Sequence, residues 1–121
     1  MAKEDIFMAI GQLAFSIAKA DGEVQAEEKE ALKNIMRANF NHEEAEQALS
    51  WVEWLDKKNQ DTIEEAYQYS MLYFRQNKQY LTQDLKQKFV NIIEQVADSS
   101  DGISSDEQAI IDKFKTDIFK I

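Results

Sequence analysis

The sequence predicts an all-α protein, a single compact bundle of about six helices that contains a duplicated helix–loop–helix unit. The chain of 121 residues suits one domain, residues 1–121, and it has no proline and only three glycines. Proline breaks helices because it lacks a backbone donor and clashes with the preceding turn, so its absence favours long helices. Apolar residues recur at spacings of three and four, and no segment alternates convincingly with period two. We therefore expect helices and no sheet.

The first helix is expected over residues 4–20, where two neighbouring stripes run along one side. The first stripe is apolar: Ile6, Ile10, Leu13 and Ile17. The second stripe consists mostly of small residues: Phe7, Gly11, Ala14 and Ala18. Its small side chains should let another helix approach closely. After a break at residues 21–24, a second helix contains Leu32, Ile35 and Met36 and ends near Phe40.

Two middle helices are predicted over residues 42–57 and 61–77. Asn41 with Glu44, and Asp61 with Glu64, have the spacing of capping boxes, in which side chains satisfy exposed backbone N–H groups at a helix start. The link between these helices is short, which favours antiparallel neighbours.

A fifth helix is expected to begin after Thr82, a suitable cap, and a last helix after Ser104, which forms a capping box with Glu107. Each contains an apolar stripe, and the residues are Leu85, Phe89, Ile92, Ile93 and Val96, followed by Ile110, Ile111, Phe114 and Ile118.

The two ends of the chain, residues 4–40 and 82–120, resemble each other. The segments 17–28 and 96–107 both contain Asp-Gly, then a β-branched apolar residue, then two acidic residues that open the next helix. The glycine suits a chain that leaves one helix and enters another, because it tolerates positive φ. The first segment has Glu23 between its glycine and its apolar residue, whereas the second has no residue there. We interpret the pair as an internal duplication.

These two segments resemble the motifs of the TerB family, the tellurite-resistance-type domains. Ala20-Asp21-Gly22-Glu23-Val24, followed by Glu27-Glu28, is similar to the first family motif. Asp101-Gly102-Ile103-Ser104, with Asp106-Glu107, resembles the second, although its spacing is one residue shorter. The resemblance covers nearly the whole chain. It implies a compact helical domain with an acidic surface, without established catalytic activity, for which metal binding has been proposed in some relatives.

The charge balance excludes several classes of function. The chain has 23 acidic and 14 basic side chains, a net charge of −9, so it should repel nucleic acids and anionic lipids. It has no cysteine, which excludes thiolate chemistry and cysteine-ligated metals. The most apolar stretch, residues 6–20, is too short to span a bilayer. With no signal-peptide pattern at its start, we expect no membrane insertion and a cytoplasmic location.

The acidic residues of the two repeated segments are the candidate metal ligands. The predicted set is Asp21, Glu23, Glu27, Glu28, Asp98, Asp101, Asp106 and Glu107. Carboxylates are the ligands that calcium and magnesium prefer, and an approach of the two halves about a pseudo-twofold axis would bring the two groups together. The alternative is structural, because acidic residues favour the first turn of a helix, where they oppose the macrodipole.

A second candidate site is an aromatic surface on the middle helices, which would bind a protein partner or a second copy of the chain. Its predicted residues are Trp51, Trp54, Tyr69 and Tyr73, side chains that are favoured at interfaces. The basic residues are predicted to be scattered and solvated: Lys57, Lys58, Arg75, Lys78, Lys86 and Lys88.

The sequence thus predicts a non-enzymatic binding or scaffold domain, resembling TerB, in a bacterial stress response. Its acidic segments would bind a divalent cation or a protein partner. Two alternatives stay open. One is a metal-dependent hydrolase that uses the same carboxylates, which requires a pocket and a base that activates water. The other is a structural homodimer without a ligand.

Overall fold

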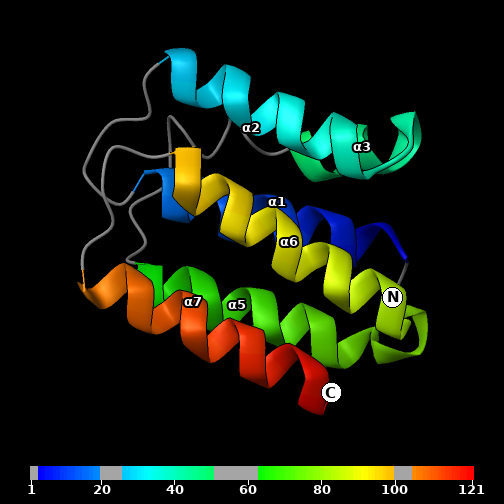
Figure 1. Cartoon of the computed structure of the whole chain (residues 1–121). Helices are drawn as coiled ribbons and strands as arrows, with labels where there is room; N and C mark the ends of the chain where they lie inside the picture. Colours follow the sequence, from blue (N-terminus) through cyan, green and yellow to red (C-terminus); the bar gives the residue numbers. More distant parts are fainter. Residues whose placement is uncertain (1–2, 20–25, 51–62, 100–104) are drawn as a thin grey trace.

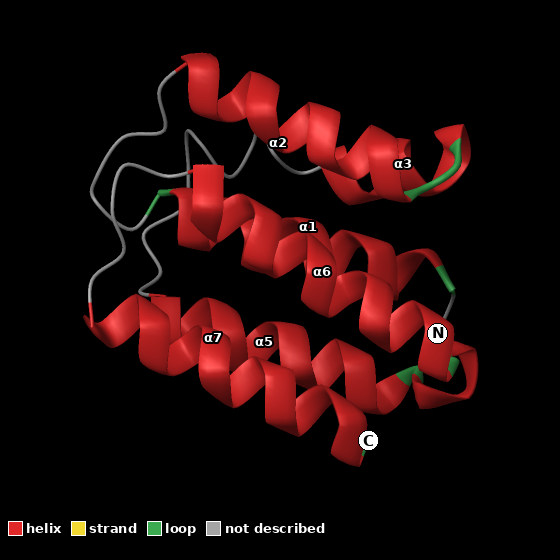
Figure 2. Cartoon of the chain, viewed as in Figure 1, coloured by secondary structure: helices red, strands yellow, loops and turns green. Residues whose placement is uncertain are grey.

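A computed structural model describes residues 3–19, 26–50, 63–99 and 105–121, and within these ranges every regular element is a helix (Figure 2). The prediction of an all-α fold is confirmed. The elements are α1 (Glu4–Ala18), α2 (Ala26–Asn39), α3 (His42–Leu49), α5 (Ile63–Gln76), α6 (Gln83–Ser99) and α7 (Ser105–Asp117), with 3-10 turns η1 (Lys78–Tyr80) and η2 (Ile118–Lys120). Among the described helices, none is long and apolar enough to cross a membrane.

The helices form three layers, with α1 and α6 in the middle (Figure 1). Helices α2 and α3 cover one side of this pair, and α5 and α7 cover the other. Because α1 packs against α3, α5 and α6, it is buried on nearly every side, and both predicted stripes lie in the core. The hydrophobic first helix is therefore the centre of the bundle.

Gly11 marks the place where α3 crosses α1. A Cβ atom at this position would overlap the carbonyl oxygen of Ala48 and lie 2.8 Å from its carbonyl carbon. The predicted close approach of another helix at the small-residue stripe is thus confirmed. The contact is between two main chains, so only a residue without a side chain fits.

Phenylalanine rings join the layers. Phe89 of α6 packs against Phe7 of α1, Phe40 at the end of α2, and Phe74 of α5, with ring centroids 6.1, 5.8 and 5.6 Å away. Phe74 in turn packs against Phe114 of α7 at 6.1 Å. All five rings are buried, and edge-to-face or tilted pairs of this kind are favourable beyond the area that they bury.

Two of the predicted helix caps are present. Asn41 and Glu44 form the full capping box, with the Asn41 side chain accepting from the Glu44 N–H and the Glu44 carboxylate accepting from the Asn41 N–H. The Thr82 hydroxyl accepts from the Leu85 N–H at 3.1 Å. Asp61 and Ser104, predicted as the other two caps, lie outside the described residues.

The two predicted repeat halves contain the helix pairs α1 with α2 and α6 with α7. Helices α1 and α6 end at the same end of the bundle, where α2 and α7 begin (Figure 1). The two pairs are not packed alike, because α2 packs on α6, the first helix of the other pair, whereas its counterpart α7 packs on α5 and on α6 of its own pair. Helices α3 and α5 lie in opposite outer layers, so the expectation of antiparallel neighbours is wrong for the described parts of the two middle helices; α1 separates them.

Candidate functional site

Acidic side chains gather at the end of the bundle where α2, α5 and α7 begin (Figure 1). Each of these helices has two acidic residues in its first turn, where they oppose the positive end of the helix macrodipole. Asp98 near the end of α6 joins them. We call this region the acidic end and define it by six residues with exposed or partly exposed side chains: Glu27, Glu28, Glu64, Glu65, Asp98 and Asp106.

The predicted metal ligands are only partly placed at this end. Glu27, Asp98 and Asp106 are exposed, Glu28 is partly exposed, and Glu107 is buried with 5% of its surface accessible. The other three predicted ligands, Asp21, Glu23 and Asp101, lie outside the described residues. Within the described ranges, no three acidic or histidine side chains are close enough to hold a metal ion. The starts of α2 and α7 lie in opposite outer layers, so their acids share one end of the bundle but not one coordination shell.

An exposed apolar face runs along α5. Tyr69, Leu72 and Tyr73 are 49%, 47% and 40% exposed, and their spacing of three and four places them on one side of the helix. The opposite side of α5 is buried against α1 and α7. Trp51 and Trp54, the other predicted partner residues, lie outside the described ranges. Leu72 was not predicted to belong to this face, because a leucine in an amphipathic helix usually lies in the core.

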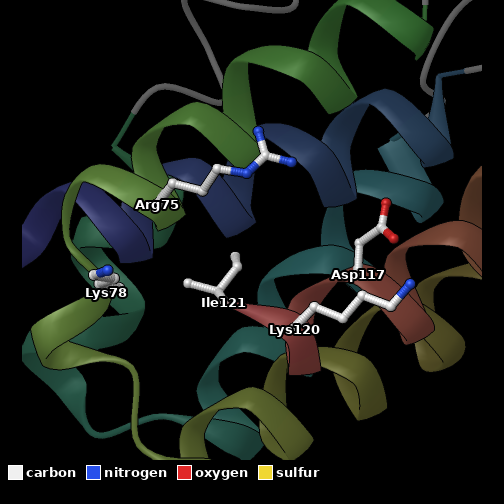
Figure 3. Close-up of a pocket in the computed structure, with 5 residues that line it drawn as sticks. All are labelled: Arg75, Lys78, Asp117, Lys120 and Ile121. Carbon is white, nitrogen blue, oxygen red and sulfur yellow. The ribbon is translucent and has the colours of Figure 1, made fainter.

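A pocket of about 400 Å³ lies at the end of the bundle where α5 and α7 finish (Figure 3). It is lined by Arg75, Lys78, Asp117, Lys120 and Ile121. The α5 side of the pocket contributes Arg75, and the α7 side contributes Asp117 and Lys120. Arg75 and Lys78 are exposed, in agreement with the prediction of solvated side chains, and they line this pocket together with Lys120.

Lys86 also departs from the prediction of a solvated lysine. Its side chain is 6% exposed, and its ammonium donates to the main-chain oxygen of Ile121 at 2.9 Å. Burial of a lysine requires a partner for the charged head, and the long aliphatic stem packs well against apolar neighbours. Lys86 thereby fixes the end of η2 next to the pocket.

The family model described as "Tellurite resistance protein TerB" matches residues 7–119, which is almost the whole chain and includes both repeated segments. The chain belongs to the TerB family. Comparisons with curated proteins and with solved structures found no match. The resemblance that the two Asp-Gly segments indicated is thus confirmed over residues 7–119 of this TerB domain.

One partly buried hydrogen bond supports the α7 side of the pocket in this TerB domain. The Tyr67 hydroxyl of α5 donates to a carboxylate oxygen of Asp117 at 2.7 Å, and the Lys113 ammonium lies 5.2 Å from the centre of the Tyr67 ring. Burial, followed by the hydrogen bond to Asp117, raises the pKa of the Tyr67 phenol well above its ordinary value. Sequence reasoning placed Tyr67 in the core but had no signal for its partner, which lies 50 positions away.

We expect Tyr67→Phe to lower the free energy of unfolding at neutral pH by about 1 kcal/mol, because it removes one hydrogen bond to a carboxylate. The raised pKa also gives a pH dependence. The folded chain keeps the phenol neutral, whereas the unfolded chain ionises it from about pH 10, so stability falls as the pH rises above that value. Urea unfolding should show that wild type and Tyr67→Phe differ less in free energy of unfolding at alkaline pH than at neutral pH. The exposed Tyr73→Phe serves as the control, and an unchanged difference at both pH values would contradict the assignment.

Proposed function

We propose that this TerB-family chain is a non-catalytic binding or scaffold domain whose acidic end binds a cationic ligand. The geometry favours the basic surface of a protein partner as this ligand. The second candidate ligand is a divalent cation such as calcium or magnesium. The family description links related proteins to tellurite resistance. A part in a bacterial stress response of that type is included in the proposal.

The observation on which the proposal rests is the number of acidic side chains that the fold assembles at one end. Three helices begin there with paired acids, and α6 ends there with Asp98. Close to these acids in the described sequence, the basic residues are Lys19, just after the end of α1, and Lys29, near the start of α2. Acids that face water from several helices create a negative potential over an area rather than at a point, and such a field attracts and orients basic surfaces.

The spread of these acids favours a protein surface over a single ion. A calcium ion needs six to eight oxygen ligands within one small shell, whereas a basic surface meets charges that are distributed over a wide area. The described acids occupy the starts of helices in both outer layers, which suits the second kind of ligand.

The exposed face of α5 supports a role in protein binding and gives the proposed partner a second contact. Tyrosine and leucine side chains in an uncovered row offer apolar area together with tyrosine hydroxyls at its rim. A separate partner is favoured over a second copy, because two chains of net charge −9 repel each other. A dimer in size-exclusion chromatography with light scattering, dissociated by Leu72→Glu, would instead favour the homodimer.

The hydrolase alternative receives no support from the pocket. That hypothesis needs the predicted carboxylates around one cavity. Among the described residues, the pocket at the end of α5 and α7 is lined by a single acidic side chain, Asp117, and by none of the predicted acids. The proposed function therefore does not include catalysis.

The test is an amide NMR titration of the intact chain with an eight-residue oligolysine peptide at physiological salt, and separately with calcium chloride and magnesium chloride. We expect saturating shifts at the starts of α2, α5 and α7. The triple variant Glu27→Gln, Glu64→Gln, Asp106→Asn should weaken peptide binding about tenfold or more, because it removes three of the charges that attract the peptide.

A matched control separates the acidic end from net charge alone. Glu4→Gln, Glu43→Gln and Glu46→Gln remove the same charge from exposed positions on α1 and α3. Equal weakening by both triple variants would mean that only the net charge matters, and the proposal would fail. Saturating shifts with calcium at about 1 mM or below would identify the cation as the ligand instead.

A further inference from the structure

The pocket at the far end of the bundle has a charge opposite to that of the chain. Arg75, Lys78 and Lys120 line it together with one carboxylate, Asp117, which gives a net charge of about +2 for the lining side chains. The whole chain has a net charge of −9. The pocket lies at the opposite end of α5 and α7 from the acidic end. Its opposite charge makes it chemically distinct from the proposed partner site.

The three cationic side chains are not neutralised within the described structure. None of them makes an ion pair with another described side chain. Asp117, the one acidic side chain in the described lining, accepts the Tyr67 hydroxyl with one carboxylate oxygen, and Tyr67 is itself buried. Lys86 is occupied by the main-chain oxygen of Ile121. The guanidinium and the two ammonium groups are thus available to a ligand.

This set of donors matches a phosphate group. A guanidinium offers a planar fork of N–H donors to two phosphate oxygens, and ammonium groups act as mobile point charges for the others. A phosphate monoester is close to a dianion at neutral pH, which balances the net charge of the lining. A volume of about 400 Å³ is within the range of small-molecule sites and leaves room for an organic group beside the phosphate.

We propose that this pocket binds the phosphate group of a small phosphorylated alcohol or sugar. Arg75, Lys78 and Lys120 hold the phosphate, Ile121 gives an apolar contact, and the free oxygen of Asp117 accepts a hydroxyl of the organic part. A nucleic-acid backbone does not fit, because the rest of the surface is acidic and repels a row of phosphates. The proposal is independent of the acidic end, and either one can fail without the other.

The test is an amide NMR titration of the full chain with inorganic phosphate and with glycerol 3-phosphate, at constant ionic strength maintained with sodium chloride. We expect saturating shifts at Arg75, Lys78 and Lys120, with a Kd of about 1–10 mM for inorganic phosphate and a lower one for glycerol 3-phosphate. Arg75→Gln should weaken both at least about tenfold. Asp117→Asn should strengthen binding of inorganic phosphate about threefold, because it removes the one repelling charge.

Arg37→Gln is the matched control, since Arg37 is an exposed arginine on α2 in the other outer layer. It should leave both affinities unchanged. Shifts that do not saturate, shifts that sodium chloride reproduces, or equal weakening by Arg37→Gln and Arg75→Gln would each overturn the proposal. Equal affinity for the two ligands would overturn the role of Asp117 and leave a site for free phosphate. If Arg75→Gln disturbs the fold, the exposed Lys120→Gln provides the same test.

Discussion

Replacing Gly11 by alanine is expected to lower the free energy of unfolding by about 3 kcal/mol or more. The new Cβ would overlap the main-chain oxygen of Ala48 and lie 2.8 Å from its carbonyl carbon. Main-chain atoms cannot rotate away as a side chain can, so α3 would have to move off α1. Both helices belong to the core, and the displacement would open contacts on either side.

The expected loss of stability at Gly11 has the opposite sign to the effect of the same change at an exposed helix position. At an exposed helix position, a change from glycine to alanine stabilises by about 0.5–1 kcal/mol, because alanine loses less backbone entropy. Urea unfolding followed by circular dichroism measures the result. Ala109→Gly, on the exposed side of α7, measures the difference in helix propensity between alanine and glycine in this protein and should cost about 1 kcal/mol. A Gly11→Ala protein as stable as the wild type would show that α3 does not cross at Gly11.

The sequence predicted this crossing but not the helix that makes it. A stripe of small residues on a hydrophobic helix indicates a close neighbour, and the spacing of apolar residues located the helices. The identity of the neighbour depends on how the helices fold back on one another, which periodicity does not contain. For the same reason, the short link that favoured antiparallel middle helices was misleading, since α3 and α5 pack on different sides of α1.

The candidate sites were predictable to different degrees. Paired acids at helix starts can be recognised in the sequence, but the addition of Glu64 and Glu65 to the acidic end depends on the direction in which α5 runs. The basic pocket gave no signal at all. Arg75 and Lys120 are far apart in the sequence, and only the packing of η2 beside the end of α5 brings them to one cavity.

Phe89→Ala is expected to cause the largest loss of stability, about 4 kcal/mol, because it leaves a cavity at the centre of the core. Phe89 is fully buried and its ring contacts rings from α1, α5 and the end of α2. It therefore contacts all three layers at once. Phe119→Ala is the matched control, since the Phe119 side chain is 40% exposed and its removal should cost less than about 1 kcal/mol.

The shape of the unfolding curve then tests whether the three layers depend on one another. If Phe89 joins them, Phe89→Ala should unfold in one transition at lower urea, with circular dichroism and intrinsic fluorescence coincident, because weakening the shared contact destabilises every layer together. Phe89→Leu should fall between the wild type and Phe89→Ala, since it restores part of the volume. Two separate transitions in Phe89→Ala would mean that α2 and α3 can unfold while α5 and α7 remain packed. In that case the acidic end would be assembled from parts that hold together independently, and its charges would not form a fixed surface.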